Sequence, residues 1–303
     1  MVKKSIAAVG VAVMILGSAQ AADSPTVSAA APAKSQATDS GSTGSEAAAS
    51  PEAPAGTWAA QGQAGLIMTS GDTTTKSGNA RFDVAHLVGR WTLSGGLGAL
   101  YASTGHYTTQ QDTNAHAQAD LALSPRTFWF SNVRYDRNLF TGFAYQESVA
   151  SGGGFKFIDT PSTLLAGELG VGYRREEPEI LTTGLLGNVT SRTTQPVVND
   201  AVLEAGVNYS HSITHLTKVV NTLLVQYGAS DTTTTDNLSL QVQVDATLSL
   251  AVGMQLVNNT SPPPGSARHT DTVMTVNLVY ALKNPKLSVL AGTPVTVNGF
   301  NLP

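Results

Sequence analysis

The chain has 303 residues, no cysteine, a formal net charge of −4 and only 13% charged residues. The lack of cysteine excludes disulfide scaffolds, cysteine-bound zinc, iron–sulfur clusters and thiol catalysis, and the negative charge argues against a nucleic-acid partner. A soluble globular domain carries ~25% charged residues, about twice the fraction in this chain. The 41% hydrophobic content and near-zero mean hydropathy exclude a wholly disordered chain.

The first 21 residues have the organisation of a secretory signal peptide. Lys3 and Lys4 form a short positive region, the apolar stretch 6–16 follows, and Ala19-Gln-Ala21 resembles a cleavage site. This apolar stretch is too short to cross a bilayer stably. We therefore predict a signal peptide over 1–21, with an uncleaved anchor helix as the alternative.

Residues 22–57 consist almost wholly of Ala, Ser, Pro, Thr and Gly and contain little that could form a core. This composition predicts a disordered linker.

From Trp58 onward, apolar and polar residues alternate with a period of two, which predicts strands and not helices. About twelve runs show the pattern: 58–70, 77–89, 91–104, 113–123, 126–137, 144–157, 163–175, 200–212, 216–229, 235–245, 247–258 and 270–282. Strands of soluble proteins average ~5–6 residues, whereas a tilted membrane-spanning strand needs ~9–11. The length of the runs favours a barrel that crosses a bilayer.

Alternation alone does not separate a membrane barrel from a soluble β-sandwich, because both have one apolar face per strand. The connections between the runs favour the barrel, because short and long ones alternate. Short ones lie near 89–90, 124–125, 159–161, 212–215 and 245–247, and longer ones at 70–76, 105–112, 138–143, 176–199, 230–234 and 259–269. Short turns at one rim and long loops at the other are typical of outer-membrane barrels. An even strand count then places both termini in the periplasm.

Aromatic residues on the apolar face of the runs form two predicted belts. Trp91 and Tyr101 are ten residues apart, as are Tyr145 and Phe155; at ~3.3 Å per residue and ~40° tilt this projects to roughly 25 Å, the height of an apolar membrane band. The periplasmic belt contains Trp58, Trp91, Trp129, Phe155, Tyr209 and Tyr280, and the outer belt contains Tyr101, Tyr135, Tyr145, Tyr173 and Tyr227. The sequence thus predicts a transmembrane antiparallel up-and-down β-barrel of about 12 strands.

Five segments give the chain a resemblance to a known family. They are Thr69-Ser-Gly-Asp-Thr-Thr-Thr75, Arg134-Tyr-Asp-Arg-Asn-Leu-Phe140, Ser151-Gly-Gly-Gly-Phe-Lys-Phe157, Gly170-Val-Gly-Tyr-Arg-Arg-Glu-Glu177, and the strand 271–282 after the proline-rich loop 261–265. In this order they resemble the salt-induced outer-membrane proteins, also called YdiY-like or domain of unknown function 481. Asp72 stands where the family more often has Asn. The resemblance covers about 58–282 and implies an outer-membrane barrel linked to salt or acid stress, with no catalytic or substrate-binding residue.

The polar face of the runs carries both signs of charge and would line the lumen. The lumen candidates are Arg81, Asp83, His116, Asp120, Arg134, Asp136, Lys156, Glu168, Arg174, Glu204, Lys218 and Asp245. Two interpretations stay open: ion pairs that fill and stiffen the barrel, or a narrow pore whose charges set selectivity. Twelve strands lie between filled eight-stranded barrels and open sixteen-stranded porins, so size does not decide.

The sequence leaves two further alternatives open. His116, with Asn114 and Asp120 on one face, is the best general-base candidate for an enzyme acting on lipid, but there is no Gly-x-Ser-x-Gly nucleophile motif. A soluble secreted sandwich or ligand-binding barrel is the other alternative. We predict no enzyme, no catalytic or metal residue and no cofactor.

The predicted organisation is a signal peptide (1–21), a linker (22–57), a barrel (58–282) and a C-terminal periplasmic tail (283–303), because Pro285 ends the last strand. The expected location is the outer membrane. The expected partners are its lipid and lipopolysaccharide, together with the barrel-assembly machinery during biogenesis, and no nucleic acid.

Overall fold

The computed structural model describes residues 57–69, 75–105, 107–183, 189–263, 269–283, 295–297 and 300–302. The predicted signal peptide, almost the whole linker and most of the tail lie outside the described residues. The barrel strands are β1 (Thr57–Thr69), β2 (Thr75–Val88), β3 (Trp91–Thr104), β4 (Tyr107–Ala122), β5 (Thr127–Asn138), β6 (Phe143–Asp159), β7 (Thr163–Thr183), β9 (Val198–Ser212), β10 (Thr217–Gly228), β11 (Thr232–Gln243), β12 (Leu248–Asn259) and β13 (Thr270–Lys283).

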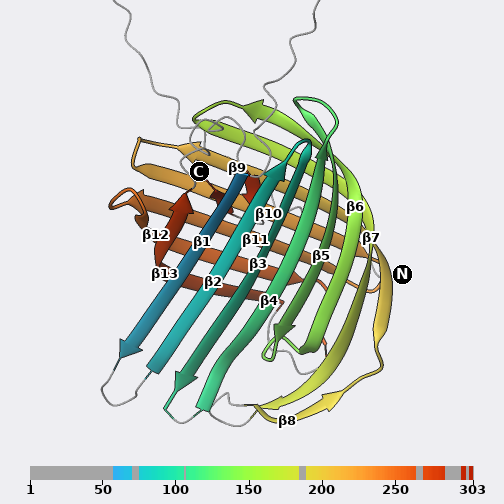
Figure 1. Cartoon of the computed structure of the whole chain (residues 1–303). Helices are drawn as coiled ribbons and strands as arrows, with labels where there is room; N and C mark the ends of the chain where they lie inside the picture. The colour runs from blue at the N-terminus through green and yellow to red at the C-terminus, as the bar shows by residue number, and fades with distance from the viewer. Residues whose placement is uncertain are drawn as a thin grey trace, which may run out of the picture. The chain divides into compact units, whose positions relative to one another are not determined.

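Each strand pairs with its sequence neighbour in an antiparallel ladder, and the tilted strands lie side by side in Figure 1. The first and last strands also pair, from Ala59 opposite Lys283 to Ala64 opposite Leu278. This pairing closes the sheet, so that no barrel strand keeps a free edge. The predicted 12-stranded antiparallel barrel is confirmed.

Two predicted loops are wrong, because strands occupy most of them. The segment 105–112 was expected as a loop, but β4 already begins at Tyr107 and pairs with the end of β3. The segment 176–199 contains the end of β7 and a short strand, β8 (Val189–Thr194), which pairs with β7 beyond the barrel rim (Figure 1). These strand extensions contain polar residues such as Thr and Arg and lack the apolar alternation that predicts a strand. Strands that extend beyond the membrane need no apolar face.

The outer surface of the barrel is apolar and exposed. Met274, Val171 and Leu66 are 72%, 70% and 69% exposed, and exposed Leu, Val and aromatic residues recur on the same parity of the barrel strands. A soluble protein rarely exposes a continuous apolar surface of this extent. The inward parity carries buried Gln, Asn, Asp and Glu together with small or apolar residues such as Phe130 and Val220. This inversion identifies the fold as a transmembrane barrel.

The eleven belt aromatics lie on this outward parity, and all except the half-buried Tyr145 and Tyr209 are exposed. Trp91 opens β3 and pairs with Leu121, whereas Tyr101 lies near the other end of the same strand. Trp58 stacks on His86 of β2 at a centroid distance of 3.9 Å.

Four of the short turns are built on one local pattern. The first turn residue, Ser124, Thr160, Thr214 or Asp245, accepts a hydrogen bond through its side chain from the backbone N–H three residues later. Its own N–H donates to the carbonyl of that same later residue. Ser, Thr and Asp favour such turns because their side chains bond the local backbone. The hydrogen bonds of these turns are therefore local to the four residues of each turn.

Within the described residues, no helix has the length and apolarity needed to span a membrane. The described part of the C-terminal segment is a small hairpin of β14 (Val295–Val297) and β15 (Phe300–Leu302). The periplasmic location of this tail stays a prediction.

Candidate functional site in the barrel lumen

Eleven of the twelve predicted lumen residues lie on the inward parity of their strands. Arg81, Asp83, His116, Asp120, Arg134, Asp136, Lys156, Glu168, Arg174, Glu204 and Lys218 alternate with outward apolar or small residues. Asp245 was expected among them and is a correction. It lies after the end of β11 in the exposed turn to β12, where its carboxylate accepts hydrogen bonds from the N–H groups of Thr247 and Leu248. These backbone bonds lower the pKa of Asp245.

Glu204 on β9 is the centre of a network that crosses the lumen. It is 1% exposed and accepts hydrogen bonds from Asn132 Nδ2 at 2.7 Å and Gln226 Nε2 at 2.8 Å. The Arg134 guanidinium lies 3.6 Å from the same carboxylate. Gln226 also donates to Ser148 Oγ on β6. Strands β5 and β6 are thereby tied to β9 and β10, which are not their ladder neighbours.

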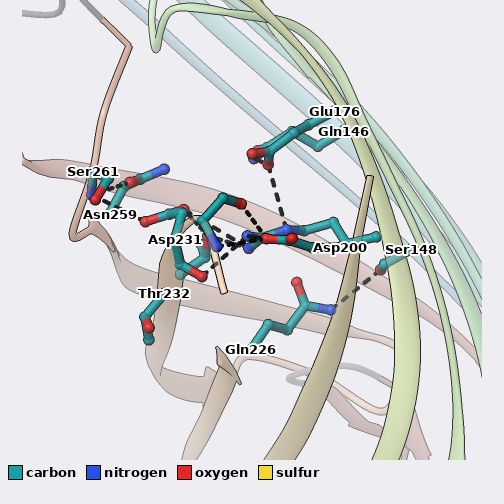
Figure 2. A network of polar contacts seen from close by, with 12 residues as sticks. Gln146, Ser148, Glu176, Asp200, Gln226, Asp231, Thr232, Asn259 and Ser261 are labelled. Carbon is teal, nitrogen blue, oxygen red and sulfur yellow. Dashed lines mark hydrogen bonds and ion pairs between the residues drawn. The ribbon is translucent and has the colours of Figure 1, made fainter. Parts of the chain in front are cut away.

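Arg174 forms a second network at the rim that carries β8. Its guanidinium is 2% exposed and lies 3.4 Å from Glu176, 3.8 Å from Asp200 and 3.8 Å from Asp231. It also donates to the Asp231 carbonyl at 3.1 Å. Figure 2 shows the side chains of Glu176, Asp200 and Asp231 converging from different elements. Three carboxylates compensate this buried cation, which joins β7 to the connection between β10 and β11.

Asp231 extends this rim network to the end of the neighbouring strand β12. Its carboxylate accepts hydrogen bonds from Thr260 Oγ1 and from the N–H of Ser261, both at 3.0 Å (Figure 2). The segment after β12 is thus fastened to the β10–β11 connection.

Nearer the opposite rim, Gln118 of β4 bridges two carboxylates. Its Nε2 donates to Asp120 at 2.9 Å and to Glu168 of β7 at 3.4 Å. The Lys156 ammonium lies 3.1 Å from Asp159 at the end of β6. The contact between Gln118 and Glu168 is another polar crosslink between strands that are not paired.

Asp83 of β2 is fully buried and is held by the Arg81 guanidinium at 2.9 Å. His116 Nε2 lies 3.9 Å from the same carboxylate and has no hydrogen-bond partner. Both side chains fold over Gly96 of β3, where a Cβ would overlap Asp83 Oδ1 and the His116 ring. Glycine at this position therefore makes room for the charged side chains.

The strands β11, β12, β13 and β1 form the other side of the lumen. Their inward polar side chains around a cavity of about 130 Å³ are amides and hydroxyls, namely Gln63, Asn237, Ser239, Gln255, Thr275 and Asn277, and the small or apolar Ala251, Gly253 and Val273 also line it. Arg81, Asp112 and Asn114 border the same cavity from β2 and β4. We call the inward faces of β11, β12, β13 and β1 the amide wall, and those of β2, β4–β7, β9 and β10 the charged wall.

Several amides of the amide wall have buried donors without partners. Gln61 and Gln63 are 2% and 6% exposed, yet their Nε2 atoms make no hydrogen bond to the residues that the structure describes, and neither does Gln241 Nε2. Asn277 donates to Gln63 Oε1 at 3.3 Å and accepts from Asn79 at 2.8 Å. The wall thus retains free hydrogen-bonding capacity inside the barrel.

Sequence reasoning missed the partners that complete these networks. Asp231, Asp200 and Glu176 around Arg174 were not among the candidates, nor were Asn132 and Gln226 around Glu204. Asp231 was assigned to a loop, and it follows Arg174 by 57 positions. Alternation could have placed the side chains on the inward face, but the partner of each depends on how the barrel closes.

His116 does not face lipid, because its inward position buries it in the charged wall. In the described part of the chain, no group of three or more His, Cys, Asp or Glu residues could hold a metal ion. The geometry around His116 thus offers no support for lipid hydrolysis.

The family model described as "Protein of unknown function, DUF481" matches residues 62–282. The chain belongs to the DUF481 family. This DUF481 barrel is 24% identical over 224 residues to "Uncharacterized protein YdiY" of Escherichia coli strain K12, covering 72% of this chain and 81% of that protein. The family resemblance predicted from the five segments is confirmed.

Three solved structures show the architecture to which this DUF481 barrel is similar. The NanC porin matches with a TM-score of 0.44 and 10% identity, over 73% of this chain and 100% of that chain. The COG4313 outer membrane channel from Pseudomonas putida F1 matches at 0.43 and 12%, over 76% and 97%. The translocator domain of the autotransporter NalP from Neisseria meningitidis matches at 0.41 and 14%, over 76% and 89%. Likenesses this distant say nothing about the solute or mechanism of the DUF481 barrel.

Proposed function

We propose that the chain forms a narrow diffusion pore for small hydrophilic solutes in the outer membrane. One observation carries this proposal: the amide wall borders a cavity of about 130 Å³, and one of its lining residues, Gln63, has a buried Nε2 with no partner among the described residues. A buried polar group without a partner costs ~1–3 kcal/mol. Water or a passing solute would supply the missing hydrogen bonds, so the amide wall is suited to a hydrated path.

The charges of the lumen as a whole favour cations. The inward acidic residues Asp83, Asp112, Asp120, Asp136, Asp159, Glu168, Glu176, Asp200, Glu204 and Asp231 outnumber the inward basic residues Arg81, Arg134, Lys156, Arg174 and Lys218. Rings of carboxylates attract cations and repel anions at close range. The pore would therefore pass small cations more readily than small anions.

A planar-bilayer recording of the purified, folded full chain tests the proposal. We expect small, discrete conductance steps. Ser239→Trp places a large side chain in the amide-lined cavity and should abolish them. Leu240→Trp, one residue away on the outward parity, is the matched control and should conduct like the wild type. Heat-modifiable gel mobility verifies folding of each variant. A folded wild-type barrel without conductance would contradict the pore.

A second candidate function is a purely structural barrel, which the cross-lumen networks of Glu204 and Arg174 favour. These bonds tie together strands that are not ladder neighbours and would stiffen the wall. The same recording distinguishes the two functions, because a structural barrel would be silent.

We further propose that both termini lie in the periplasm, since the short turns on their side resemble periplasmic turns. A protease site inserted between Ser230 and Asp231 should be cleaved in intact cells, and one inserted between Thr214 and His215 should be protected.

The family resemblance supports a role in envelope salt stress. A deletion strain should then grow more slowly at high salt, and Ser239→Trp should fail to restore growth if conduction is the function.

A further inference from the structure

A groove of about 610 Å³ lies on the outer, membrane-facing surface of the barrel. It crosses β4, β5, β6 and β7 and follows two rows of paired residues. One row runs through Ala115, Tyr135, Glu147 and Arg175, and the other through Ala117, Val133, Val149 and Tyr173. All eight residues line the groove.

The two rows differ in chemistry. The row nearer the β8 rim contains a guanidinium, a carboxylate and a phenol, whereas the row nearer the membrane centre is apolar except for one tyrosine hydroxyl. Small alanines on β4 form the floor at one end of both rows, and Val133 and Val149 are about half exposed. The groove is thus amphipathic along the direction of the membrane normal, as a lipid molecule is.

Arg175 supplies an available cation at the polar end. It is exposed, and its guanidinium carbon lies 5.9 Å from the Tyr145 ring centroid. Tyr145 in turn stacks on Tyr135 at 6.4 Å. In the described residues, Arg175 has this cation–π contact and no ion pair with a carboxylate. A second exposed arginine, Arg137, follows Tyr135 on the same face of β5.

We infer that this groove binds a phosphorylated glycolipid of the outer leaflet. Guanidinium groups at the rim recognise phosphate. The Glu147 carboxylate would accept hydrogen bonds from sugar hydroxyls, a role that a simple phospholipid headgroup does not require, and the apolar row would hold an acyl chain. The inference rests on the proposed orientation, which places the β8 rim at the outer leaflet.

The test is lipid binding by the purified full chain in detergent, measured by native mass spectrometry with hexa-acylated lipid A and with phosphatidylglycerol as probes. We expect lipid A to bind in preference to phosphatidylglycerol. Arg175→Gln should weaken lipid A binding by about tenfold, the loss of one charge-assisted contact. Arg126→Gln, an exposed arginine in a turn at the opposite rim, is the matched control and should bind like the wild type.

Ala117→Trp fills the groove from its apolar row and gives an independent second variant. It should weaken lipid A binding as well, with folding verified by heat-modifiable mobility. Equal binding of the two lipids, or unchanged binding by both groove variants, would overturn the inference. Conductance of the same variants separates this inference from the pore, because the groove lies outside the lumen and the variants should conduct normally.

Discussion

The amide wall and the charged wall face each other across one lumen, yet they solve the burial of polar groups differently. On the charged wall, Glu204 and Arg174 each find several partners, some of them across the barrel. On the amide wall, Gln61 and Gln63 keep buried donors without protein partners. Burying a charge requires full compensation, whereas a neutral amide tolerates water as a partner. The charged wall is therefore suited to hold the barrel together and the amide wall to let solutes pass.

The largest expected effect is the loss of stability in Glu204→Leu. The substitution leaves the Arg134 guanidinium without its nearby carboxylate and removes the acceptor of Asn132 and Gln226, so we expect a loss of about 3–5 kcal/mol. Denaturant unfolding in lipid vesicles, followed by tryptophan fluorescence, measures it.

Gln61→Leu on the amide wall is the control for this measurement. Its Nε2 has no partner among the described residues to lose, so the expected cost is below about 1 kcal/mol. Similar losses of unfolding free energy in both variants would show that the two walls do not differ in their contribution to stability.

The next effect concerns the rim. Arg174→Gln removes the cation among Glu176, Asp200 and Asp231 and leaves their negative charge uncompensated. We expect a severalfold higher conductance. In a salt gradient, we expect the reversal potential to shift in the direction of stronger cation selectivity. Arg175→Gln, on the outer face of the same strand, should leave both quantities unchanged. An unaltered reversal potential in Arg174→Gln would place the conducting path away from this network.

The smallest effect lies outside both walls, at the turn residue Asp245. Backbone hydrogen bonds from Thr247 and Leu248 hold its pKa in the folded state below the usual value for an aspartate. The stabilisation is therefore present above the unfolded pKa and is lost as the pH falls through the folded pKa. Asp245→Asn retains a side-chain acceptor without a titrating charge, so its stability should fall less than that of the wild type when the pH is lowered from about 5 to 3. Parallel curves would exclude this contribution.

The sequence by itself determined the architecture and the two faces of each strand. Period-two alternation located the twelve barrel strands, and the side chains of Ser124, Thr160, Thr214 and Asp245 specify four of the turns locally. Such features depend on residues close together in the chain. Even so, alternation failed for Asp245, because a strand end is set by where the turn begins and not by the pattern.

Only the tertiary structure decided which lumen residues meet. Arg174 and Asp231 are 57 positions apart, and Asn132 and Glu204 are 72 apart. Their contact depends on barrel closure and strand tilt, and neither leaves a local trace in the sequence. The same holds for the division into two walls and for the groove on β4–β7. Each requires several strands to be placed side by side in register, because a cavity is a property of neighbouring strands and not of any one of them.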